Sequence, residues 1–70
     1  ALNGGVNGLD LIKKIIYKSK KLLKKSGILA IEIGNHQYLR VRHLLAENGL
    51  REIGKVHDFG RNVRCIISTK

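Results

Sequence analysis

The sequence predicts an α/β fold with the element order helix, strand, helix, strand, strand, and a mixed three-stranded sheet. Three observations carry this prediction. A lysine-rich segment has apolar residues at helical spacing, a continuous apolar run follows it, and two strand-like segments flank a short glycine-containing link. Because the 70 residues contain no proline, linker or internal repeat, we expect one domain or a segment of one.

The first element is an amphipathic helix expected over about residues 8–25. Its apolar positions are Leu9, Ile12, Ile15, Ile16, Leu22 and Leu23. Lysines fill the outward positions between them. Asn7 is expected to cap the amino end, with Asp10 completing a capping-box-like pair, and Ser26-Gly27 is expected to end the helix.

The next element is a strand over Ile28–Ile33. Five of its six residues are apolar and do not alternate with polar ones, which is typical of a strand covered on both faces. Glu32 is therefore expected to be buried and hydrogen-bonded, as a structural anchor rather than a site residue. Only one partner strand is available, so the other edge would be unpaired and would recruit another chain. Either the chain self-associates or its true neighbour lies upstream, and we favour the second.

A second helix is expected after Asn35, which is placed as its cap. Its predicted inner face consists of Tyr38, Val41, Leu44 and Leu45. Asn48-Gly49-Leu50 predicts a Schellman ending, with Gly49 left-handed and Leu50 folding back. Two strands, over about Glu52–Phe59 and Val63–Thr69, are joined through Gly60-Arg61-Asn62 and are expected to form an antiparallel hairpin.

The composition restricts the classes of function. The net charge of +9 favours an anionic partner, so a small basic module that binds RNA or DNA phosphates is an alternative hypothesis. The scarcity of aromatic residues argues against base stacking and makes this alternative the weaker one. No apolar run is long enough to span a membrane. Cys65 is the only cysteine, which excludes an internal disulfide and suits a reducing compartment.

No metal site is predicted. His36 and His43 lie two helical turns apart, too far to share one ion even with Glu47 nearby. His57 is expected at the surface, and Cys65 as a small buried apolar residue.

Several motifs together resemble the HemK-type family of protein (glutamine-N5) methyltransferases, which act on peptide-chain release factors. These are Gly4-Gly5-Val6-Asn7-Gly8-Leu9, then Gly27, Ile31-Glu32-Ile33-Gly34 and Gln37, and later Gly49-Leu50, Asp58, Gly60 and Arg64. Three departures exist: Asn7 replaces an Asp, Ser26 replaces part of a Pro-Gly-Gly turn, and Gly60 stands one place early.

The resemblance implies a Rossmann-like methyltransferase sheet, of which residues 1–70 would be the C-terminal segment and would supply the last three strands. The final strand would lie between the other two. The parent protein would be a cytoplasmic enzyme that transfers a methyl group from S-adenosylmethionine to a glutamine side-chain amide of a release factor.

The resemblance also implies which residues are absent. The chain has no G-x-G loop for S-adenosylmethionine and no Asn-Pro-Pro-Tyr motif for the substrate amide, so no catalytic, cofactor-binding or metal-ligating residue is predicted, and the chain alone is expected to be inactive. Gly4, Gly5 and Gly8 are predicted near the substrate entrance of the intact enzyme, or are ordinary lead-in glycines. Glu32 and Gly34 are predicted to support the site structurally.

Overall fold

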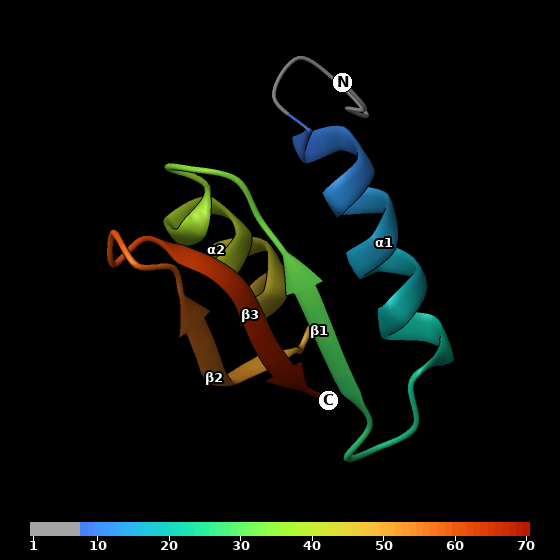
Figure 1. Ribbon diagram of the computed structural model, residues 1–70. Helices are drawn as coiled ribbons and strands as arrows, with labels where there is room; N and C mark the ends of the chain where they lie inside the picture. The colour runs from blue at the N-terminus through green and yellow to red at the C-terminus, as the bar shows by residue number, and fades with distance from the viewer. Residues whose placement is uncertain (1–7) are drawn as a thin grey trace.

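The computed structural model describes residues 8–70, which form two helices and a three-stranded sheet (Figure 1). The elements are α1 (Leu9–Leu22), β1 (Ile28–Glu32), α2 (Tyr38–Glu47), β2 (Arg51–His57) and β3 (Val63–Thr69). The predicted α/β class and element order are confirmed. Gly4, Gly5 and Asn7 lie outside the described residues, so the predictions made for Gly4 and Gly5 stay predictions, whereas Gly8 takes the N-cap position of α1 that was predicted for Asn7.

The sheet has the strand order β1-β3-β2, and β3 pairs antiparallel with both neighbours. The last strand therefore lies between the other two, as the resemblance implied. The prediction of a mixed sheet is wrong, because β1 and β2 run in the same direction but are separated by β3, so no adjacent pair is parallel. After β1, helix α2 leads the chain to β2, which lies one strand away from β1. The chain then turns back, and β3 pairs between β1 and β2.

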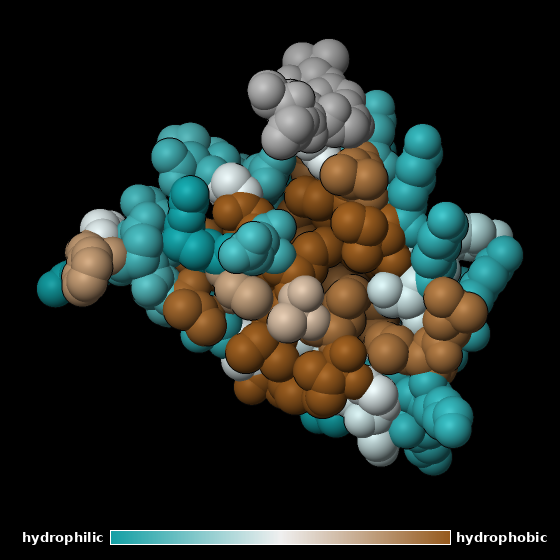
Figure 2. Space-filling model, turned by 45° about the vertical axis from the view of Figure 1, so that its right-hand side comes forward, coloured by the Kyte–Doolittle hydropathy of each residue, from teal (hydrophilic) through white to brown (hydrophobic). Residues whose placement is uncertain are grey.

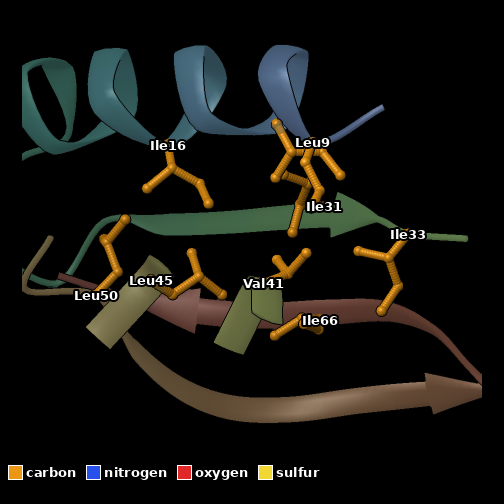
Figure 3. Close-up of a cluster of buried hydrophobic side chains, with 9 residues drawn as sticks. Leu9, Ile16, Ile31, Ile33, Val41, Leu45, Leu50 and Ile66 are labelled. Carbon is orange, nitrogen blue, oxygen red and sulfur yellow. The ribbon is translucent and has the colours of Figure 1, made fainter. Parts of the chain in front are cut away.

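The core lies between the two helices and one face of the sheet, where side chains of α1, α2, β1 and β3 point toward one another (Figure 3). Its buried apolar residues are Leu9, Ile12, Ile16, Ile31, Ile33, Val41, Leu45, Leu50 and Ile66. Ile31 and Ile66 are cross-strand partners at the centre of this cluster. Each such burial contributes about 1.5–3 kcal/mol, so these aliphatic side chains hold the layers together.

The opposite face of the sheet is open. In β1, Ile31 is buried but Ile28 is 54% exposed, and Val56 of β2 is 51% exposed. The prediction that the strand over residues 28–33 is covered on both faces is therefore wrong for the described residues. Glu32 belongs to the same open face and is exposed, and no hydrogen bond or ion pair of its side chain is seen within residues 8–70, so its predicted burial is also wrong. Figure 2 shows apolar side chains gathered on the side of the molecule where α1 and the sheet face the viewer.

The helix α1 is shorter than predicted. Gly8, with φ 80°, occupies its N-cap position without a side-chain cap, and the helix ends at Leu22 rather than near residue 25. Ser26 takes a positive φ of 70° in the turn that follows. The predicted apolar face is only partly buried, since Ile15 is 37% and Leu22 is 80% exposed.

The helix α2 also starts later than predicted. Gln37 is its N-cap residue, without a side-chain cap bond, so the prediction that Asn35 caps the helix is wrong. The predicted inner face is confirmed, because Val41 and Leu45 are buried and Tyr38 and Leu44 pack against the core.

The carboxyl end of α2 is the predicted Schellman motif. Gly49 has φ 76°, its amide donates to the Ala46 carbonyl, and the Leu50 amide donates to the Leu45 carbonyl at 2.9 Å. Leu50 is 1% exposed, so the fold-back also contributes to the core.

Candidate functional site

The candidate site is the loop that follows the carboxyl end of β1, at residues 34–37. The Gly34 amide donates a 2.7 Å hydrogen bond to Oε1 of Gln37, and the Gln37 amide donates back to the Gly34 carbonyl at 3.3 Å. His36, between them, has a positive φ of 63°. The two bonds close the loop into a tight turn, which directs the chain from β1 into α2.

Gly8 lies against the same loop. A Cβ atom built on Gly8 would stand 3.7 Å from Nε2 of Gln37, and one built on Gly34 would stand 3.3 Å from Oε1 of the same side chain. The structure therefore brings Gly8, Gly34 and Gln37 together, although the sequence places Gly8 before a whole helix and strand. Of the glycines predicted near the substrate entrance, Gly8 is the one that residues 8–70 include.

An arginine joins this loop to the β2–β3 hairpin. Nη1 of Arg64 donates to Oδ1 of Asn35 at 2.7 Å, and its Nε lies 3.8 Å from Oδ2 of Asp58. The Asn62 backbone amide donates to Asp58 at 2.9 Å. This bond, followed by weaker contributions that include the Arg64 charge, holds the pKa of Asp58 below its ordinary value of 3.8.

The Asn35–Arg64 contact was not predicted. Arg64 entered the sequence argument only as part of the family pattern, and Asn35 was assigned to a helix cap. Because β1 and β3 are antiparallel, the end of β1 and the start of β3 lie at the same sheet edge. That topology was the signal from which the contact could have been found.

A hollow of about 490 Å³ lies beside the loop. It is lined by Leu9, Gly34, Asn35, His36, Gln37 and Arg40. No carboxylate lines this hollow, whereas Arg40 contributes a permanent positive charge. The arrangement therefore favours a neutral polar or an anionic group over a cation.

A second polar cluster joins α2 to β2 and was missed by the sequence argument. The Tyr38 hydroxyl donates to Oε1 of Glu52 at 2.8 Å, and Nζ of Lys55 donates to that hydroxyl at 3.3 Å. Arg42 lies 3.7 Å from the same carboxylate. The hydrogen bond to Tyr38 is the main cause that raises the pKa of Lys55 above its ordinary value of 10.5. These contacts attach a helix to a strand, so we assign them a structural role.

The remaining candidates do not assemble into a site. His43 lies 3.2 Å from Glu47 on the exposed surface of α2, and His57 is exposed on β2. Cys65 is partly buried. Within residues 8–70, no three His, Cys, Asp or Glu side chains are close enough together to hold a metal ion. Over the same residues, no helix combines the length and apolar character needed to cross a membrane.

The fold and the loop together define an α/β unit whose polar loop follows the carboxyl end of β1 and meets the start of β3 at the same end of the sheet. Curated relatives identify the family more closely. Release factor glutamine methyltransferases from Clostridium acetobutylicum and Thermodesulfovibrio yellowstonii are each 37% identical over all 70 residues. A ribosomal protein uL3 glutamine methyltransferase from Francisella tularensis is 47% identical over 38 residues, which are 54% of this chain and 12% of that protein.

These relatives confirm the family resemblance: the chain is similar, over its whole length, to part of a release factor glutamine methyltransferase. It covers 25% of the length of each of the two relatives that match all of it. No family model and no solved structure matches the chain.

The described loop does not fit S-adenosylmethionine. That cofactor carries a positively charged sulfonium, whereas the hollow is lined by Arg40 and by no carboxylate. A cofactor of this kind is also commonly held by an acidic residue at its ribose, and no acidic residue lines the hollow. No step of a reaction is therefore assigned to these residues.

Proposed function

We propose that this chain is the C-terminal segment of a single methyltransferase domain, and that the whole enzyme transfers a methyl group from S-adenosylmethionine to a glutamine side-chain amide of a peptide-chain release factor. The observation that supports this most directly is similarity over all 70 residues to release factor glutamine methyltransferases about four times as long. The release factor is preferred to ribosomal protein uL3 as substrate, because the uL3-specific relative matches only 38 residues.

The geometry supports a larger parent domain. Within residues 8–70, strand β1 has a paired neighbour on one side only, and the sheet face that carries Ile28 and Val56 is open. An unpaired apolar edge beside an apolar face is a combination that folded proteins cover. In the proposal, upstream polypeptide of a Rossmann-like domain adds a strand beside β1 and a layer over that face. Glu32 would then be enclosed and would gain the anchoring partners predicted for it.

In the proposed enzyme, the residues of this chain support the site but do not react. Gln37 holds the Gly34 turn, and Gly8, which has a positive φ, lies beside the Gln37 side chain. Gly4, Gly5 and Gly8 would line the substrate entrance. The groups that bind the cofactor and accept the amide N–H bonds belong to the upstream part. A cytoplasmic location is part of the proposal, because the substrate is a translation factor.

The test is a chimera. The quarter of the Clostridium acetobutylicum enzyme that aligns with this chain is replaced by the chain, and methylation of a release factor is followed by transfer of a labelled methyl group. The proposal expects activity from the chimera and none from the 70-residue chain alone. The unaltered relative is the positive control, and uL3 is assayed in parallel. A folded chimera that binds S-adenosylmethionine but leaves the release factor unmodified would contradict the proposal.

A further inference from the structure

A groove separates α1 from α2 on the side of the molecule away from the open sheet face. Its volume is about 430 Å³, and we call it the interhelical groove. It is lined by Leu9, Lys13, Leu39, Arg40, His43 and Leu44. Leu9 and Leu44 are largely withdrawn from solvent, whereas Leu39 is 73% exposed. The groove therefore has an apolar floor and an apolar rim residue that the chain itself leaves uncovered.

The rim is positively charged. Lys13 and Arg40 are exposed, and neither takes part in an ion pair within residues 8–70. No acidic residue lines the groove. Since the whole chain carries a net charge of +9, carboxylates elsewhere do not offset this potential.

From this combination we infer that the interhelical groove binds a protein segment in which an apolar side chain lies between acidic residues. The leucines form an apolar surface on which an apolar side chain of the partner is removed from water. The two cations favour partners with neighbouring Asp or Glu side chains. RNA satisfies only the second requirement, because no aromatic side chain lines the groove for a base to stack on.

The groove is continuous with the candidate site. Leu9 and Arg40 line both the interhelical groove and the hollow beside the Gln37 loop. A segment bound between the helices would therefore extend toward the carboxyl end of β1. The inference concerns binding and does not depend on methyl transfer, so it survives or fails separately from the proposed enzyme activity.

The test measures binding of a short fluorescent peptide, in which a pair of leucines lies between glutamates, to the 70-residue chain by fluorescence anisotropy. We expect R40E and the exposed-residue variant L39D each to weaken binding about tenfold or more. K18E makes the same charge change as R40E, but on the outer surface of α1 away from the groove, and is expected to leave binding within about twofold. Circular dichroism confirms that each variant is folded.

Two further arms separate the alternatives. A second peptide with serines in place of the leucines should bind about tenfold more weakly, because the apolar contact is lost. An RNA oligonucleotide should not displace the leucine peptide at low concentration. Equal weakening by K18E and R40E, equal binding of the serine peptide, or displacement by RNA at low concentration would each overturn the inference, because each describes a general polyanion surface.

Discussion

Arg61 adopts a φ of 66°, in the left-handed region that favours glycine, while its neighbour Gly60 does not have a positive φ. Gly60, the hairpin glycine, stands one place early for the family pattern. The structure explains this displacement. The left-handed conformation falls on the third residue after Asp58, which is Arg61, and the Arg61 amide donates to the Asp58 carbonyl at 3.0 Å.

Replacing Arg61 with glycine should therefore stabilise the chain. A residue with a side chain loses about 1–2 kcal/mol in the left-handed region. Glycine avoids this cost, but its greater freedom in the unfolded chain offsets part of the gain. The control is Arg61→Ala, which removes the same charge but keeps the Cβ atom. We expect R61G to exceed R61A by about 1 kcal/mol in the free energy of unfolding measured with urea. Equal values would show that the turn relaxes around the side chain.

Asp58 makes the same turn sensitive to pH. The Asn62 amide is the first cause that lowers the pKa of this carboxyl below 3.8 in the folded chain. A group with a lowered folded-state pKa contributes stability that is present above its unfolded pKa and is lost as the pH falls through the folded value.

The variant D58N should remove this contribution. The stability difference between the parent chain and D58N should be constant near neutral pH and should shrink as the pH falls below about 4. Urea unfolding at a series of pH values measures the difference, and an NMR titration of the Asp58 carboxyl measures its pKa directly. An Asp58 pKa at or above 3.8 would contradict the prediction.

At the scale of single elements, the existence and order of all five could be predicted, and their ends less well. The Schellman ending of α2 was predictable because Gly49 and Leu50 encode it locally. The start of α2 was not, because Asn35 suits a cap equally well, and its side chain is engaged by Arg64, 29 positions away. The same reason applies to the candidate site: Gly34 and Gln37 are close in sequence, whereas the contacts of Gly8 and Arg64 depend on the tertiary fold.

The carboxyl end of α2 provides a clean measurement of backbone strain. Gly49 has φ 76°, and a Cβ atom built on it would meet nothing within 4 Å. Gly49→Ala should therefore cost about 1 kcal/mol for conformational reasons alone. Gly49→Asn should cost less, because asparagine tolerates the left-handed region better. Thermal or urea unfolding of the two variants distinguishes them, and an equal cost would show that the left-handed conformation at residue 49 does not determine the loss.

For the whole molecule, the apolar run over residues 28–33 led to two linked predictions with different outcomes. The unpaired edge of β1 was predicted correctly, because the number of strands in the chain limits the pairing. Coverage of both faces was not, because an apolar run does not show which layers the same segment supplies, and within residues 8–70 the two helices pack on one face of the sheet. The open face and the unpaired edge are two aspects of the same missing contacts.

Two opposing forces therefore act when the isolated chain meets a second copy. The edge of β1 and the exposed Ile28 favour association, whereas a net charge of +9 on each copy opposes it. Salt shortens the range of the repulsion to about 10 Å at 0.1 M and leaves the apolar contact intact. Self-association should consequently increase with salt concentration, which is the reverse of what binding to a polyanion would do.

Sedimentation velocity over a range of protein and salt concentrations tests this expectation. The variant I28K places one lysine on the edge strand and should shift the chain toward the monomer at every salt concentration, because a charge on an edge disfavours strand pairing. Phe59→Lys is the matched control, since Phe59 is a fully exposed apolar residue that belongs to the hairpin loop rather than to the open face. A parent chain that stays monomeric in high salt, or a control that dissociates as completely as the edge variant, would mean that the edge of β1 does not drive association.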